Sequence, residues 1–115
     1  MIPSVTKIDK GFYIGHFSCI VVSPDAIIGK NVNISQGVTI GRASRGEKEG
    51  AAIISDEVYI GPGAKIVGKI IIGNNVAIGA NAVVTKDVPP NAVVGGIPAK
   101  IISMHGAEGY INKRV

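Results

Sequence analysis

The feature that most constrains the fold is a six-residue repeat of aliphatic side chains. In the second half of the chain they recur without a break, at positions 54, 60, 66, 72, 78 and 84. A step of six matches neither a helix nor a simple alternating strand. A second apolar residue stands two positions before each of these from position 60 on, so both lie on one face of a short strand. Gly and Asn residues between the strands favour turns. Each unit is therefore predicted to be one short strand and one corner of a parallel β-helix.

The repeat extends toward the N-terminus with two interruptions. Earlier units are predicted at Ile8, Ile14 and Ile20, and then, after a two-residue slip within 21–27, at positions 28, 34 and 40. The loop "GRASRGEKEGAA" precedes the uninterrupted part. Twelve units on three flat sides give about four coils, or a prism roughly 19 Å tall at the spacing of β-strands. We expect one all-β domain over 1–115, with coils at 5–90 and a C-terminal segment, 91–115, that forms a short tail or helix.

Composition excludes several classes of protein. A chain of 115 residues is near the size at which a single core suffices, so help from partner subunits is expected. No apolar run reaches the length of a membrane span, and no signal-peptide pattern opens the chain, so a cytoplasmic protein without membrane contact is predicted. One cysteine and two histidines argue against disulfides and a dedicated metal site. The net charge of +4 is diffuse, and the basic residues of the loop are balanced by Glu47 and Glu49, which disfavours nucleic-acid binding.

Four segments, in this order, resemble one family of proteins. They are "GFYIGHFSCIVV" (11–22), "ISQGVTIG" (34–41), "VYIGPGAKIVG" (58–68) and "IGANAVVTKDVPPNAVVGGIPAKII" (78–102). Together they resemble the hexapeptide-repeat acyltransferases, most closely the serine acetyltransferase-like and polysaccharide O-acetyltransferase branches. The resemblance implies a left-handed coil, a homotrimer with active sites between neighbouring subunits, acetyl-CoA as donor and no metal.

The resemblance also implies a donor site on the last coil and the segment after it. In similar enzymes the coil's backbone meets the pantetheine arm and basic side chains meet the phosphates. The donor-binding positions of the family fall on Pro62, Ala80, Thr85, Lys86 and Lys100. Lys100 stands where the family has a phosphate-contacting arginine, so a single ammonium replaces a guanidinium that could bind in a bidentate way. Ser103 stands where the family has a second such arginine. Pro89 and Pro90 are expected to end the coil, since proline cannot donate to a strand ladder. The alternative is that "TKDVPP" is only a polar cap on the solenoid.

The candidate for the chemistry is His16, within "YIGHFS", where similar serine acetyltransferases carry a catalytic histidine. A neutral imidazole can take the proton of an acceptor hydroxyl near pH 7. If Ile14, Ile34, Ile60 and Ile78 stack, the residues two positions further on form a column of His16, Gln36, Pro62 and Ala80. Gly15 and Gln36 are then candidates for contact with the acceptor. His105, beyond the repeats, is expected to be an ordinary surface histidine.

The acetyl group could pass directly from acetyl-CoA to the acceptor, or it could pass through a covalent intermediate on Cys19. A cysteine in an apolar coil is more often a packing residue, so the direct route is predicted. The carbonic anhydrases that share this solenoid need three histidines around a metal, whereas this chain has two.

The acceptor is where this chain differs from the serine enzymes. Gly15 stands where they have an aspartate, Met1 where the histidine-orienting aspartate would fall, and Ala51 where a second active-site histidine lies. Asp9 is a possible substitute for the orienting carboxylate. We therefore predict acetyl transfer to a hydroxyl of a sugar or polysaccharide precursor. The alternatives are a serine O-acetyltransferase-like enzyme and a non-catalytic trimeric scaffold.

Overall fold

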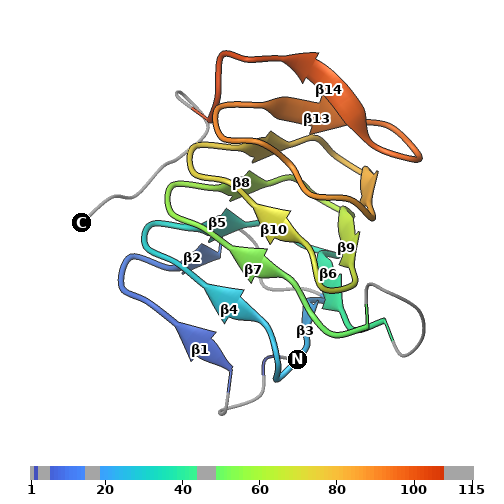
Figure 1. Ribbon diagram of the computed structural model, residues 1–115. Helices are drawn as coiled ribbons and strands as arrows, with labels where there is room; N and C mark the ends of the chain where they lie inside the picture. The colour runs from blue at the N-terminus through green and yellow to red at the C-terminus, as the bar shows by residue number, and fades with distance from the viewer. Residues whose placement is uncertain (1, 3–5, 15–18, 44–48, 108–115) are drawn as a thin grey trace.

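The chain winds into a short triangular prism of stacked coils (Figure 1). The computed structural model describes residues 2, 6–14, 19–43 and 49–107. Three sheets form the sides. The first sheet contains β1 (Lys7–Ile8), β4 (Ile27–Ile28), β7 (Ile53–Ile54) and β10 (Ile71–Ile72). The second contains β2 (Tyr13–Ile14), β5 (Asn33–Ile34), β8 (Tyr59–Ile60), β11 (Ala77–Ile78), β13 (Val93–Gly95) and β14 (Lys100–Ser103). The third contains β3 (Val21–Val22), β6 (Thr39–Gly41), β9 (Lys65–Val67) and β12 (Val83–Val84).

The predicted stacking is confirmed strand by strand. In the second sheet Ile14 pairs with Ile34, Ile34 with Ile60, and Ile60 with Ile78, all in parallel register. The aliphatic side chains of this column point inward, and those of the last three are at most 1% exposed. The six-residue period thus places one aliphatic side chain from each side of every coil in a continuous core, which is where most of the folding free energy comes from.

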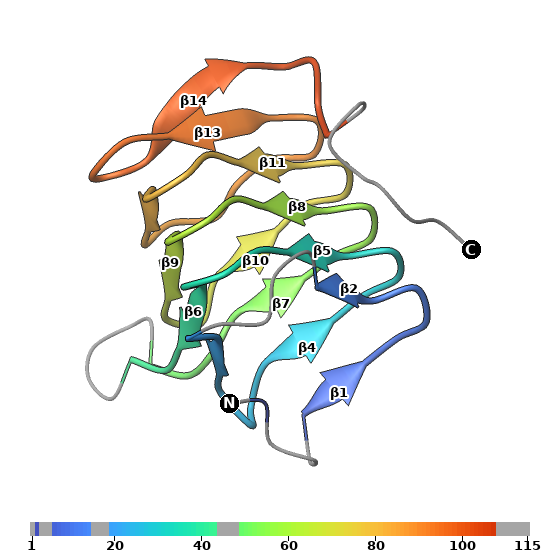
Figure 2. The same cartoon turned by 180° about the vertical axis from the view of Figure 1, so that it is seen from behind.

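The coil rises in a left-handed sense. Followed upward from β1 in Figure 1, the chain passes from the front sheet around the left corner to the rear sheet and returns on the right. Figure 2 shows the rear sheet, with β2 at the bottom and β13 and β14 at the top. This confirms the expected handedness. Within the described ranges all regular structure is β, and no helix there is long and apolar enough to cross a membrane.

The two-residue slip lies earlier than predicted. Val22, and not Ile20, pairs with Ile40 in the third sheet, and the following unit at Ile28 comes six residues after Val22. The extra two residues therefore fall between Ile14 and Val22. Both Ile20 and Val22 are buried, so the pattern of apolar residues could not decide between them. Strand pairing decides it, because only one of the two can occupy the ladder position opposite Ile40.

The stack continues beyond the two prolines. Val88 forms a parallel bridge with Ile72, and β13 pairs in parallel with β11. The prolines thus turn a corner and do not end the coil. After β13 the chain reverses, and β14 returns antiparallel to it, so the residues after the last coil begin with a strand where a tail or helix was expected.

Candidate functional site

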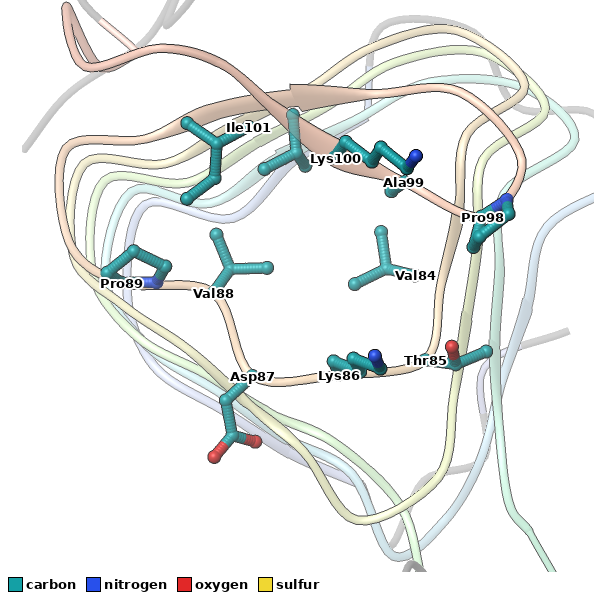
Figure 3. A pocket seen from close by; sticks show the side chains of 11 residues that line it. Val84, Thr85, Lys86, Asp87, Val88, Pro89, Pro98, Ala99, Lys100 and Ile101 are labelled. Atoms are coloured by element: carbon teal, nitrogen blue, oxygen red, sulfur yellow. The ribbon is translucent and has the colours of Figure 1, made fainter.

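A cavity of about 350 Å³ opens at the C-terminal end of the prism. Figure 3 shows it down the coil, with the side chains of Val84 and Val88 pointing toward its middle. Lys86 and Lys100 lie on opposite sides of the opening (Figure 3). Thr85 is on the same rim. The cavity therefore joins an apolar floor to two ammonium groups, a combination suited to a ligand with an apolar part and anionic groups.

The rim is positioned by the two segments that meet there. The carboxylate of Asp87 accepts a hydrogen bond of 2.9 Å from the backbone N–H of Ile71, which fixes the segment after β12 to the coil below. The backbone N–H of Ala99 donates to the carbonyl of Val83 at 2.9 Å, which holds the start of β14 over the other side. Both lysines are exposed, and neither ammonium forms an ion pair with another described residue. Their charges are presented to solvent at the mouth of the cavity.

Three of the five predicted donor residues are brought together here, and two are not. Thr85, Lys86 and Lys100 line the cavity. Pro62 and Ala80 lie on the corner between the second and third sheets, outside this lining.

That corner contains the predicted column. The N–H of Gly63 donates to the carbonyl of Gln36 at 2.9 Å, and the N–H of Asn81 donates to the carbonyl of Pro62 at 2.8 Å. Gln36, Pro62 and Ala80 therefore follow one another from coil to coil, as expected. Gly15 and His16 lie outside the described residues, so their place in the column stays a prediction.

The sequence motif around Cys19 led to one wrong expectation. Cys19 is exposed, whereas it was expected to pack in the coil. Counted back from Val22 it takes the corner position that Gly37, Gly63 and Asn81 hold in later coils. Its φ of 54° matches the left-handed backbone of those residues, at 73°, 73° and 59°. The extra two residues before Val22 move the cysteine from a core position to the corner.

One residue at this corner was not singled out from the sequence. The ammonium of Lys65 donates to the carbonyl of Gly37 at 2.7 Å and to that of Gly63 at 3.0 Å. It ties two successive coils together beside Gln36 and Pro62. Its position in "GPGAK" places it two residues after a corner glycine, a spacing that could have indicated the contact.

Comparison with known proteins identifies the repeat. Residues 51–86 match the family described as Bacterial transferase hexapeptide (six repeats). The chain is similar to the serine acetyltransferase of Bacillus pumilus, with 38% identity over 104 residues, which is 90% of this chain and 48% of that protein. It is 42% identical over 100 residues to the serine acetyltransferase of Staphylococcus aureus, covering 87% of this chain and 47% of that one. Residues 51–86 thus carry the repeat of the hexapeptide-repeat transferases.

Solved structures agree with this assignment. The serine acetyltransferase of Brucella abortus in complex with coenzyme A has a TM-score of 0.82 and 37% identity, over 89% of this chain and 41% of that chain. Soybean serine acetyltransferase complexed with serine has a TM-score of 0.82 and 39% identity, over 88% and 42% respectively. The chain spans less than half the length of these relatives.

The remaining candidates of this hexapeptide-repeat chain lie apart from the cavity. Ala51 is 7% exposed, at the end of a loop whose base is closed by an antiparallel bridge between Ala43 and Gly50. The carboxylate of Asp9 accepts a hydrogen bond from the N–H of Lys10 at 2.8 Å. His105 is exposed beyond β14. Among the residues that the structure describes, no three His, Cys, Asp or Glu side chains are grouped as metal ligands.

Two ion pairs of Arg42 lie at the base of the loop that follows β6. The guanidinium of Arg42 lies 2.6 Å from the carboxylate of Asp25 and 3.6 Å from that of Glu49. All three side chains are close to half exposed, so these ion pairs contribute little to stability and mainly fix the direction in which the loop leaves the coil.

Proposed function

We propose that the protein is an acetyl-CoA-dependent O-acetyltransferase that transfers the acetyl group directly to a hydroxyl of a small acceptor. The observation that carries the proposal is the cavity between Lys86 and Lys100, in a chain similar over about nine-tenths of its length to serine acetyltransferases. One of those relatives has been solved with coenzyme A.

The donor fits the end of the prism by its chemistry. Coenzyme A carries phosphates, which ammonium groups bind, and a long pantetheine arm, which needs an extended groove. We assign the phosphates to Lys86 and Lys100, and the arm to the corner that contains Pro62 and Ala80. The last coil ends with β13, and the cavity lies where this coil meets the segment after it, between 84–89 and 94–101.

The reaction we propose needs one general base. His16 takes the proton of the acceptor hydroxyl, and the oxygen attacks the thioester carbonyl of acetyl-CoA. Backbone N–H groups at a corner stabilise the resulting oxyanion. The C–S bond then breaks, the acetyl group stays on the acceptor oxygen, and the coenzyme A thiolate leaves and takes up a proton.

For the acceptor, the relatives favour serine over the sugar hydroxyl predicted from the sequence. Several are named serine acetyltransferases, and two of the structures are complexes with serine. Gly15 and Ala51 differ from the serine enzymes at acceptor-side positions, so we propose serine or a related small hydroxyl compound first and a sugar second. Because the donor is an intracellular metabolite, we place the reaction in the cytoplasm. We propose a homotrimer as the assembly that completes the site between subunits.

The test is a panel of acceptors assayed by release of the coenzyme A thiol. Serine, homoserine, threonine and a series of monosaccharides are each supplied with acetyl-CoA, and hydrolysis without acceptor is subtracted. We expect turnover with serine or a close analogue. Turnover with a sugar and with no amino acid would support the sugar acceptor predicted from the sequence over serine. Coenzyme A binding by calorimetry without turnover on any acceptor would place the acceptor outside this panel. No binding at all would reject the donor site and favour the non-catalytic scaffold.

A further inference from the structure

One lysine of the prism binds backbone carbonyls in place of a carboxylate. Lys65 is the first residue of β9 and lies on the outer face of the third sheet, beside the corner that joins β8 to β9 (Figure 2). Its ammonium donates to the carbonyls of Gly37 and Gly63, at 2.7 Å and 3.0 Å. It forms no ion pair with a carboxylate of the described residues. Within that part of the chain, carbonyl dipoles alone stabilise its charge.

The repeat itself does not require a charge at this position. β9 pairs with β6 and β12, and Lys65 lies opposite Thr39 on one side and Val83 on the other. Val21 holds the same outward position in the first coil, opposite Thr39. Uncharged side chains thus fill this position in the neighbouring coils. The lysine therefore belongs to this one coil, and the coil geometry alone does not account for it.

The two corner residues that the ammonium contacts leave it uncovered. Gly37 and Gly63 both have φ of 73°, in the left-handed region that glycine adopts without a steric cost. Neither has a side chain that could lie over the ammonium, and Lys65 is partly exposed. A lysine ammonium has one more N–H than these two carbonyls use. This N–H can be donated to a ligand that lies along the corner.

The donor proposed above brings suitable acceptors to this corner. Gly37 and Gly63 directly follow Gln36 and Pro62, which lie on the corner assigned to the pantetheine arm. The arm contains amide groups, and their carbonyl oxygens accept charge-assisted hydrogen bonds from an ammonium. β9 lies one coil below β12, and the residues directly after β12 line the end cavity. An arm that leaves the cavity along this corner therefore passes Lys65.

On the basis of the proposed function, we propose that Lys65 is a further donor-binding residue. Its ammonium, fixed in place by the carbonyls of Gly37 and Gly63, donates its remaining N–H to an amide carbonyl of the pantetheine arm. The lysines then divide the donor between them. Lys86 and Lys100 bind the phosphates at one end, and Lys65 binds the arm between the phosphates and the thioester.

The first test compares two ligands by calorimetry. Coenzyme A contains the pantetheine arm, whereas adenosine 3′,5′-bisphosphate has the nucleotide end without the arm. Lys65→Met removes the ammonium and keeps an unbranched side chain. It should weaken coenzyme A binding by about tenfold, the usual effect of losing one hydrogen bond from a charged group, and leave the affinity for the bisphosphate unchanged. Lys86→Ala should weaken the binding of both ligands, because both contain phosphates.

Lys69→Met is the matched control, since Lys69 is an exposed lysine in the turn between β9 and β10. It should leave both affinities unchanged. Unchanged coenzyme A affinity in Lys65→Met would overturn the inference while the donor site itself stands. An equal loss for both ligands would indicate general damage to the corner and would also overturn it. Absence of coenzyme A binding to the wild-type protein would instead reject the proposed donor site, and this contact with it.

The second test needs no variant and separates a contact with the arm from mere support of the corner. The lysines of the wild-type protein are reductively methylated, and each site is followed by peptide mass spectrometry. Because Lys65 is partly exposed, the reagent reaches it in the unliganded protein. We expect coenzyme A to slow its methylation severalfold, the bisphosphate to have no effect on it, and Lys69 to react at one rate throughout. Equal rates at Lys65 with and without coenzyme A, or equal protection by the bisphosphate, would overturn the assignment to the arm.

Discussion

At the scale of single residues, one corner of the prism contains a residue type that its backbone disfavours. Between the first and second sheets, Asn31, Glu57, Asn75 and Asn91 stack with φ between 54° and 68°. Asparagine tolerates this left-handed region, whereas glutamate pays a steric cost. Glu57 keeps its place in the column because its carboxylate accepts a 2.7 Å hydrogen bond from the amide of Asn31. This column of corner residues thus depends on local backbone preference as well as on contacts between coils.

The first prediction follows from this corner. Glu57→Asn should raise the free energy of unfolding by about 1 kcal/mol, because asparagine removes most of the left-handed strain and can still accept from Asn31. The reverse change, Asn91→Glu, should lower it by a similar amount, since Asn91 occupies the same position two coils later. Urea denaturation measures both, and a stabilisation by Asn91→Glu would show that backbone preference does not govern this column.

The second prediction concerns the proposed base. His16→Ala should lower turnover of a competent acceptor by roughly 10²–10⁴-fold while coenzyme A affinity is retained, the usual effect of losing a positioned general base. Since a base must be unprotonated to accept a proton, wild-type turnover should fall as the pH is lowered, and this limb should be absent in the variant. His105→Ala, which changes an exposed histidine beyond β14, should have almost no effect. Full turnover by His16→Ala would show that His16 is not the general base.

The third prediction concerns the two lysines of the cavity. Lys86→Ala and Lys100→Ala should each weaken coenzyme A binding by about 1 kcal/mol, because each removes one exposed charge from a phosphate contact. The binding of dephospho-CoA, which lacks one phosphate, should be weakened less by these substitutions. Isothermal titration calorimetry with both ligands gives the comparison, and the loss should shrink as salt is added. Unchanged affinities in both variants would place the phosphates elsewhere.

At the scale of the coil elements, successive coils approach so closely that some corner positions accept only glycine. A Cβ on Gly73 would lie 2.6 Å from the backbone nitrogen of Pro90, and one on Gly61 would lie 2.9 Å from the backbone of the next coil. The coil spacing of about 4.8 Å leaves no room for a side chain that points along the stack. These glycines allow successive coils to stack at this spacing.

The fourth prediction tests this packing. Gly73→Ala should lower the free energy of unfolding by about 1–3 kcal/mol, since backbone and not a flexible side chain must move. Gly41→Ala is the matched control, because Gly41 also follows a buried isoleucine but its Cβ would meet only side-chain atoms at 3.7 Å and 4.0 Å. It should change stability by less than about 0.5 kcal/mol. Thermal or urea unfolding of the two variants checks the contrast, and equal losses would show that glycine is needed for another reason.

At the scale of the whole molecule, a prism this small has a large surface for its volume. The outward side chains of Ile27 and Ile71 on the first sheet are 41% and 52% exposed, and Val21 on the third is 46% exposed. Such apolar residues on flat sides favour packing of prisms side by side. This supports the proposed trimer through the sides.

The fifth prediction is therefore an assembly of three chains. Sedimentation equilibrium of the wild-type protein should give three times the mass of one chain at micromolar concentration. His16→Ala should give the same mass. A stable monomer would contradict the trimer.

The sequence by itself determined the repeating part of this molecule. A period of six with inward aliphatic residues allows one arrangement of strand and corner, and each coil repeats it, so the column of Ile14, Ile34, Ile60 and Ile78 followed from counting. Tertiary structure decided the places where the count is ambiguous or ends. Ile20 and Val22 are equally apolar, so only pairing with Ile40 located the slip and moved Cys19 to a corner. The end cavity needed β14 to reverse direction over the last coil, and the Lys65 contact needed two corners 26 residues apart to stack. Local patterns specify which side chains of each strand point into the core. Contacts between coils depend on the register of the strands, which only the folded chain fixes.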